Sequence, residues 1–177
     1  RGSVLEIKAG FAKGMFTGFI RVKGKPLGLI ANNPLFLAGA IDSDGADKAS
    51  RFIKLCENYN IPILSLCDTP GMMVGPEVEE TGLVRHCCRL FLAGANVTVP
   101  MMTIVLRKAY GLGAQAMAGG SFMAPQFVVG WPTAEIGAMG LEGAVKLGYR
   151  KELEAESDVE KKAVSYTHLR AHETNSH

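Results

Sequence analysis

Hydrophobic and polar positions follow two different rhythms in the first third of the chain. In the stretch FIRVKGKPLGLIANN, residues 19–33, apolar and polar residues alternate up to Gly24, and an apolar run follows from Leu27 to Ala31. This pattern predicts two strands joined by a Lys-Gly-Lys turn. From Asp42, apolar residues recur every three or four positions, which predicts a helix over residues 43–59. The chain is therefore expected to begin as a hairpin followed by a helix.

Short apolar runs then alternate with longer segments of helical spacing. The strand-like runs are 61–67, 99–106 and 126–132, and the helix-permissive segments are 76–97, 107–120 and 134–148. On the helix over 76–97, the predicted apolar side carries Val84, Cys87, Cys88, Phe91 and Leu92. Strands that alternate with helices of this length imply right-handed βαβ crossovers and a mostly parallel sheet. The sequence thus predicts an α/β fold.

Three glycine-rich segments follow the predicted strands: DTPGMMVGP at 68–76, YGLGAQAMAGG at 110–120 and PTAEIGAMG at 132–140. In a parallel α/β sheet, these turns lie at the carboxyl edge, where ligands usually bind. Glycine tolerates positive φ and lets a ligand approach the backbone, so such a turn can present free N–H groups to a phosphate or to a developing oxyanion. One oxyanion donor lowers a barrier by about 3 to 4 kcal/mol and needs no catalytic side chain.

Two other interpretations of these glycines stay open. The stretch from Gly111 to Ala116 fits the dinucleotide motif G-x-G-x-x-G/A, with Glu135 about twenty residues beyond it. The polar residues 107–110, which separate the predicted strand from Gly111, count against that motif. Alternatively, the small residues only let helices and strands pack closely.

Composition narrows the function class. The 177 residues are 47% hydrophobic and 20% charged, with a formal net charge of +2, and the basic residues are scattered rather than clustered. These values disfavour a nucleic-acid binder. No apolar run approaches the ~18 to 20 residues of a membrane span. The four cysteines lack metal-ligand spacing, so we expect reduced thiols and a cytoplasmic protein, with Cys87 and Cys88 buried.

The last fourteen residues, 164–177, read differently from the rest. Their first eleven, VSYTHLRAHET, resemble the translation of a common sequencing-library adapter, and the segment has no apolar periodicity. We therefore interpret 1–163 as the domain, truncated at both ends, and 164–177 as non-native read-through. Only His86 then remains of the four histidines, which leaves little for a zinc cluster or for Ser-His or Cys-His catalysis. His86 itself is expected to be a surface or packing residue.

Four stretches together resemble a known family. They are GFIRVKGKPLGLIANNP, the long segment from DKASRFIKLCENYN through DTPGMMVGP to HCCRLFLA, VPMMTIVLRKAYGLGAQAM, and WPTAEIGAMGLEGAV. They are similar to the carboxyl-terminal half of the carboxyltransferase β-type subunit of biotin-dependent acyl-CoA carboxylases, in the propionyl-CoA and acetyl-CoA carboxylase group. The resemblance runs from about residue 11 to 147. It implies a crotonase-like (ClpP/crotonase) fold of repeated β-β-α units.

The resemblance also implies an activity and its site. The family transfers a carboxyl group between carboxybiotin, held on a carrier protein, and an acyl-CoA. Carried over residue by residue, the backbone amides that hold the biotin oxyanion fall on Leu112 and Gly113, which are the predicted catalytic positions. The predicted biotin or substrate contacts are Gly71, Gly75, Gly111, Ala114 and Gln115, and no metal is expected. Gln115 departs from the family pattern, because it stands where many propionyl-type members have an aspartate linked to acyl-chain selectivity.

The partners implied by the resemblance are the amino-terminal carboxyltransferase domain of a second subunit, a biotin carboxylase and the biotin carrier protein, in a homo-oligomer. In a eukaryote the location would be the mitochondrial matrix. Two alternatives remain: the α-subunit of a biotin-dependent acyl-CoA decarboxylase, which runs the transfer in reverse, or a non-catalytic assembly module. Asp68, at the end of a predicted strand, is expected either to cap the turn or to contact substrate.

Overall fold

The computed structural model describes residues 3–155 together with 164 and 167. They belong to two compact units, Arg1–Ile136 and Gly137–His177. The interpretation of 164–177 as read-through falls almost wholly outside the described residues. The first unit contains the sheet and the glycine-rich turns, so the site is built within it.

The predicted hairpin is confirmed. Strand β2 (Met15–Val22) pairs antiparallel with β3 (Lys25–Asn32), and Val22 faces Lys25 across the turn. The two turn residues, Lys23 and Gly24, both have positive φ, at 49° and 80°. Positive φ at both positions is what a two-residue turn needs to match the twist of its strands. The short strand β1 (Val4–Glu6) adds antiparallel to β2.

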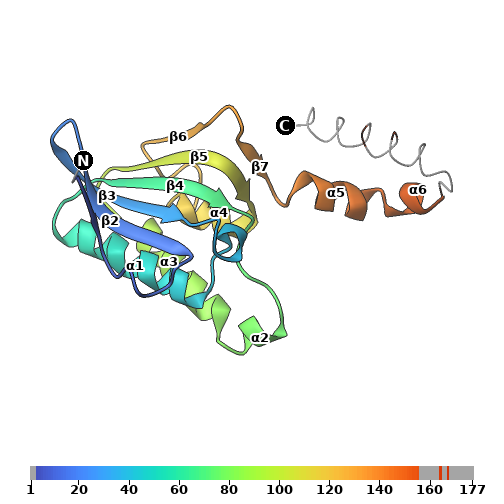
Figure 1. Cartoon of the computed structure of the whole chain (residues 1–177), viewed down its shortest axis with the longest axis horizontal. Coiled ribbons are helices and arrows are strands. Elements are labelled where there is room, and N and C mark those ends of the chain that lie inside the picture. Colours follow the sequence, from blue (N-terminus) through green and yellow to red (C-terminus); the bar gives the residue numbers. More distant parts are fainter. Residues whose placement is uncertain (1–2, 156–163, 165–166, 168–177) are drawn as a thin grey trace. The chain divides into compact units, whose positions relative to one another are not determined.

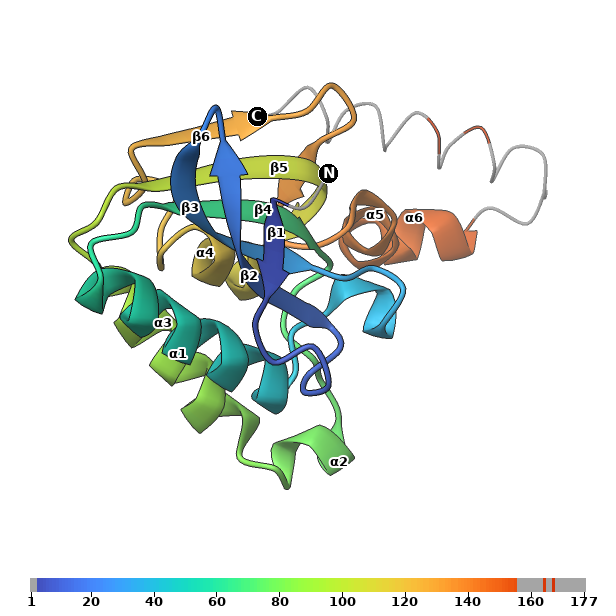
Figure 2. The ribbon, with the colours of Figure 1, turned by 60° about the vertical axis from the view of Figure 1, so that its left-hand side comes forward.

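The predicted helix over 43–59 is also confirmed, as α1 (Ser43–Asn58). Asp42 caps it, since its Oδ1 accepts a hydrogen bond of 2.7 Å from the N–H of Gly45. The buried side of α1 includes Ala46, Ala49 and Ile53. Figures 1 and 2 show α1 and α3 on the same face of the sheet, and the two helices pack against each other.

The sheet is mixed, with the predicted parallel pairing among its central strands and antiparallel pairing on one side. Its order is β1-β2-β3-β4-β5-β6, with β4 (Ile63–Thr69), β5 (Met101–Tyr110) and β6 (Phe127–Gly130); β7 (Glu135–Gly137) pairs with β5. Strands β3 to β6 are parallel to one another, while β2 is antiparallel to both of its neighbours, β1 and β3. The carboxyl ends of β3 to β6 therefore share one edge, as expected for a ligand-binding edge.

The helix predicted over 76–97 is broken in two. Helix α2 (Pro76–Glu79) ends early, and α3 (Leu83–Ala95) starts after Gly82, whose φ of 71° interrupts the helix. The apolar side of α3 was also predicted in the wrong register for three residues. Val84 and Leu92 are 65% and 62% exposed and Cys88 is exposed, whereas the buried residues are Leu83, Cys87, Leu90, Ala93 and Gly94.

Two further predictions are wrong at the ends of elements. Strand β5 does not stop at Leu106 but continues to Tyr110, so Gly111 follows the strand directly. The segment 134–148 is not one helix, because it begins as β7 and becomes helical only in α5 (Leu141–Gly148), which α6 (Arg150–Ala155) follows.

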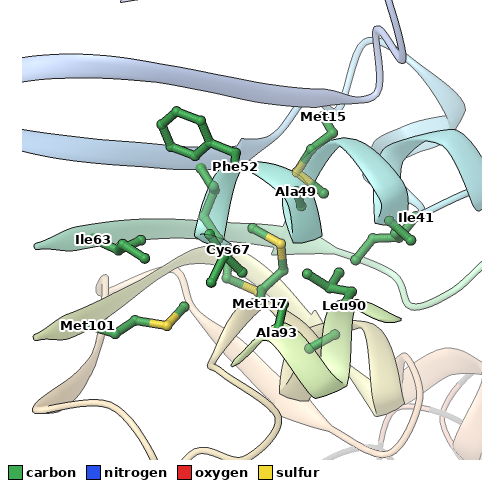
Figure 3. Packing of buried hydrophobic residues seen from close by; sticks show 14 of the residues in the cluster. Met15, Ile41, Ala49, Phe52, Ile63, Cys67, Leu90, Ala93, Met101 and Met117 are labelled. Carbon is green, nitrogen blue, oxygen red and sulfur yellow. The ribbon is translucent and has the colours of Figure 1, made fainter. Parts of the chain in front are cut away.

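The core lies between the sheet and its helices. Figure 3 shows Ile63, Cys67 and Met101 of the sheet together with Ala49 and Phe52 of α1, Leu90 and Ala93 of α3, and Met117 of α4 (Gly111–Met117). A one-turn helix, η1 (Leu37–Gly39), follows β3. Within the described part of the chain, no helix is long and apolar enough to cross a membrane.

Candidate functional site

Three segments meet where the parallel strands end. The loop after β3 joins the loop after β4 through Ile41, whose N–H donates to the carbonyl of Gly71 at 3.1 Å and whose carbonyl accepts from the N–H of Met73 at 2.9 Å. The third segment is the start of α4, which follows β5. The first two glycine-rich turns singled out in the sequence thus lie together at this edge.

The loop after β4 touches α4 at two glycines. A Cβ added to Gly113 would lie 2.6 Å from the carbonyl carbon of Gly71 and 2.7 Å from its Cα, closer than real Cβ atoms approach other atoms. Gly71 has a φ of 131°, which L-residues with side chains rarely adopt. Both positions therefore require glycine, one for space and one for conformation. Close packing, the plainest interpretation of these glycines, accounts for Gly113, and it also brings the two turns together.

Helix α4 begins with a glycine in the left-handed region. Gly111 has a φ of 55°, in the left-handed region, and Leu112 and Gly113 follow it in the first helical turn. A left-handed residue followed by right-handed ones turns successive N–H groups toward one concavity, and the first N–H groups of a helix lack acceptors within it. The Leu112 side chain is 61% exposed, while Gly113 is buried.

The other predicted contact residues differ in accessibility. Gly75 has a φ of 131° and precedes α2, and it is half-buried. Gln115 is also half-buried on α4. Ala114 is fully buried in the core, so its methyl group packs against the protein. Their roles toward biotin or substrate stay predictions.

A polar network holds β4 and β5 together just before the glycines. Asp68 is 8% exposed, and its carboxylate accepts from the Lys108 N–H at 3.2 Å and from the Arg107 guanidinium at 3.2 and 3.4 Å. Its own N–H donates to Asn32 Oδ1 at 3.1 Å. The Lys108 ammonium donates to the Ala38 carbonyl at 2.8 Å. Asp68 thus binds neighbouring strands, which favours the structural alternative stated for it.

The segment after β6 runs beside the second half of β5. The Trp131 N–H donates to the Val105 carbonyl at 2.8 Å, and the Thr133 hydroxyl donates to the Leu106 carbonyl at 3.0 Å. The Tyr110 hydroxyl donates a short hydrogen bond to Glu135. This role of Glu135 was not predicted, because Tyr110 and Glu135 lie 25 residues apart in the sequence.

Asp47, His86 and Arg89 form a separate ionic cluster between α1 and α3. His86 Nδ1 lies 3.0 Å from Asp47 Oδ1 and Arg89 lies 3.2 Å from the same carboxylate, so His86 is a packing residue between α1 and α3. Burial alone would raise the pKa of Asp47, but hydrogen bonds and charges from His86 and Arg89 outweigh it and lower that pKa. Among the described residues, no group of three or more His, Cys, Asp or Glu is placed to hold a metal ion.

The cysteines behave as two classes. Burial raises the pKa of the Cys56 and Cys67 thiols to about 12 and that of Cys87 to about 11. Cys88 is exposed, which corrects the prediction that it is buried beside Cys87. The α3 register explains the difference, because Cys88 lies one residue past the core-facing position.

Known proteins resemble this chain over nearly its whole length. It is 42% identical to the methylmalonyl-CoA carboxyltransferase 12S subunit of Propionibacterium freudenreichii subsp. shermanii, over 89% of this chain and 30% of that protein. It is 42% identical to the biotin-dependent acetyl-/propionyl-coenzyme A carboxylase beta5 subunit of Mycobacterium tuberculosis, over 84% of this chain and 27% of that one.

A solved structure extends the likeness to the fold. A single-chain, multi-domain long-chain acyl-CoA carboxylase matches 98% of this chain with a TM-score of 0.84 and 52% identity, and this chain covers 18% of it. The chain thus spans less than a third of each of these proteins. The family model of the carboxyl transferase domain matches residues 1–176. Its motifs, its fold and this match agree: the chain belongs to the carboxyl transferase domain family.

Proposed function

We propose that this chain is part of an enzyme that transfers a carboxyl group between biotin, held on a carrier protein, and an acyl-CoA. Its part in the reaction is the biotin-side anion site at the head of α4. The observation that carries the proposal is the meeting of Gly71 and Gly113, which brings two glycine turns together beside the left-handed Gly111. The names of the relatives support the reaction class.

The residues at this edge fit biotin. Biotin, when bound, supplies a ureido ring that accepts or releases the carboxyl group and bears an oxygen on which negative charge can gather. The edge offers backbone N–H groups at a helix head, and neither Gly71 nor Gly113 adds a side chain there. In this proposal Gly71, Gly75, Gly111 and Gln115 would contact biotin or substrate, and the buried Ala114 would shape the site from behind.

In this proposal, backbone N–H groups rather than side chains stabilise the charge that develops in the reaction. The N–H groups of Leu112 and Gly113 donate to the oxygen that becomes negative, and they cost no reorganisation because the glycine contact and β5 already hold them. No side chain of the edge has to act as acid or base. The Asp68 carboxylate is occupied by Arg107 and Lys108.

The finer features follow the same proposal. The β2-β3-α1 succession supports a crotonase-like fold of repeated β-β-α units. The term "subunit" in the relatives' names supports partners, which we propose to be the amino-terminal domain of a second copy, a biotin carboxylase and the carrier protein, in a cytoplasmic homo-oligomer.

The relatives' names specify different acyl chains. We expect the half-buried Gln115 to influence which acyl-CoA this protein uses.

The test uses the intact parent subunit and free biotin. Leu112→Pro removes one N–H in the first turn of a helix, where proline is tolerated, and Leu112→Ala keeps the N–H while shortening the same exposed side chain. We expect Leu112→Pro to lower biotin-dependent decarboxylation of carboxylated acyl-CoA thioesters by about 10²-fold and Leu112→Ala to leave it near wild type. Equal turnover in both, with unchanged melting temperatures, would contradict the proposal.

A further inference from the structure

Asp68 lies at an irregularity between the two central strands. Cys67 pairs with Val105 and Thr69 pairs with Ala109, so Asp68 alone on β4 faces Leu106, Arg107 and Lys108 on β5. Such a bulge bends its strand and leaves backbone groups without ladder partners. Bulges beside functional sites often re-aim the residues that follow them. Here those residues are Tyr110 and the head of α4.

The Asp68 carboxylate takes the place of the missing ladder bond. One oxygen accepts from the Lys108 N–H at 3.2 Å and from Arg107 Nε at 3.4 Å, and the other accepts from Arg107 Nη2 at 3.2 Å. Its backbone is held as well, by the Asn32 side chain and by close contact of its carbonyl with Gly39. Asp68 as a whole residue is 8% exposed, and both carboxylate oxygens accept hydrogen bonds from protein donors. The carboxylate is therefore occupied in holding the bulge.

These contacts close a ring of chain. From Asp68 the chain runs three residues to Gly71, which touches Gly113. From Lys108 it runs three residues to Gly111 and on to Gly113. We call this closed path, Asp68–Gly71 together with Lys108–Gly113, the edge ring. It is pinned at one end by the Asp68 carboxylate and at the other by the contact between the two glycines.

We propose that Asp68 is a positioning residue, which sets where the Leu112 and Gly113 amides lie by holding the β5 bulge, and does not touch substrate. This inference rests on the proposed function, since it concerns the same amides. If the bulge relaxes, the edge ring loses its Asp68 anchor and keeps the Thr69–Ala109 pairing and the glycine contact. The Leu112 and Gly113 amides then shift relative to the loop after β4. A misplacement of about 1 Å in a catalytic group can lower a rate by about 10²-fold.

The chain offers a matched control. Asp47 is a second largely buried aspartate paired with an arginine; its side chain is 13% exposed and that of Asp68 is 11% exposed. Asp47 joins α1 to α3 and lies outside the edge ring. Truncating either carboxylate removes an arginine partner, but only Asp68 holds the bulge.

The experiment compares Asp68→Ala, Asp68→Asn and Asp47→Ala in the intact parent subunit. We expect Asp68→Ala to lower kcat for biotin-dependent decarboxylation by about 10²-fold, with the KM for the acyl-CoA within about twofold. Asp68→Asn keeps an oxygen that can accept from the Lys108 N–H, so its kcat is expected within about tenfold of wild type. Asp47→Ala is expected to keep the wild-type kcat.

A second measurement does not depend on activity. Hydrogen–deuterium exchange of the peptide covering residues 107–117 should speed up in Asp68→Ala, largely recover in Asp68→Asn and stay unchanged in Asp47→Ala. The peptide that covers β2, which contains neither aspartate, should exchange as in wild type in all three. This pattern would support positioning rather than general loss of stability.

Each contrary outcome is decisive. Wild-type kcat in Asp68→Ala, with Leu112→Pro inactive, would overturn the positioning role and leave the proposed amides standing. Equal losses of kcat in Asp68→Ala and Asp47→Ala would mean that the effect is a general loss of stability. Hydrogen–deuterium exchange that rises across the whole chain would mean the same. Either result would also overturn the positioning role. If both Leu112→Pro and Asp68→Ala keep full turnover, the proposed function itself fails, and the positioning role fails with it.

Discussion

The carboxyl edge and the helix-covered face of the sheet are built by different means. At the edge, position is set by backbone conformation and polar contacts: left-handed Gly111, the contact of Gly71 with Gly113, and the Asp68 carboxylate on the bulge. On the covered face, position is set by volume, with Leu90, Ile63 and their neighbours fully buried. From this difference we expect substitutions at the edge to lower activity and substitutions in the core to lower stability.

The largest stability effect is expected from the core. Leu90→Ala deletes most of a fully buried side chain and should lower the free energy of unfolding by about 2 to 5 kcal/mol, through lost burial and the cavity left behind. Chemical denaturation measures it, and turnover per folded molecule should not change. If Leu90→Ala lost turnover at temperatures below its melting range, the core would also determine activity, which would contradict this comparison.

Gly113→Ala should affect both quantities. The added methyl group would overlap the Gly71 backbone, so we expect a loss of about 1 to 3 kcal/mol in stability together with a fall in biotin-dependent turnover. Gly143→Ala is the comparison, because a Cβ there has only an ordinary contact with Met139. Retained turnover in Gly113→Ala would show that the two turns need not meet closely.

Two buried threonines differ in whether their hydroxyl group has a hydrogen-bond partner. Thr17 donates to the Ile7 carbonyl at 2.9 Å, whereas Thr103 Oγ1 has no partner among the described residues. Thr17→Val should therefore cost about 1 kcal/mol, and Thr103→Val should be neutral or stabilising by up to about 1 kcal/mol. Thermal melting of the pair tests this, and an equal cost in both would indicate a bound water or another acceptor at Thr103.

The smallest effect concerns thiol reactivity. Cys88 is exposed, so a maleimide at pH 7.5 should label it at once, while Cys56, Cys67 and Cys87 should react only after unfolding because burial raises the pKa of each thiol. Mass spectrometry of digested samples, taken with and without denaturant, locates the label. Early labelling of Cys67 would mean that the sheet opens locally.

Much of this fold could be predicted because its local signals were strong. The Lys-Gly-Lys turn, the helical spacing after Asp42 and the apolar run of β4 each follow a rule that acts within a few residues. Gly82 itself was a signal for the break between α2 and α3, but the residues on both sides of it have helical periodicity. Periodicity also misassigned Val84 and Leu92, since it shows that a residue is apolar and not which surface it faces.

The candidate site was predictable only in part. The glycines could be placed at a strand end from the sequence, and Leu112 and Gly113 came from the family resemblance. The network around them could not be predicted, because Arg107 and Lys108 were interpreted as polar residues beyond the strand. Their partners Asp68 and Ala38 are distant in the sequence. Charged residues inside β5 are tolerated because each finds a long-range acceptor.

The contact between Gly71 and Gly113 has a consequence for engineering. The spacing of the two turns is set by side chains that are missing, so no added group can tighten it and any added group widens it. A graft of this edge onto another α/β scaffold would have to carry both glycines and the bulge together. Homologous sequences should likewise keep glycine at both positions.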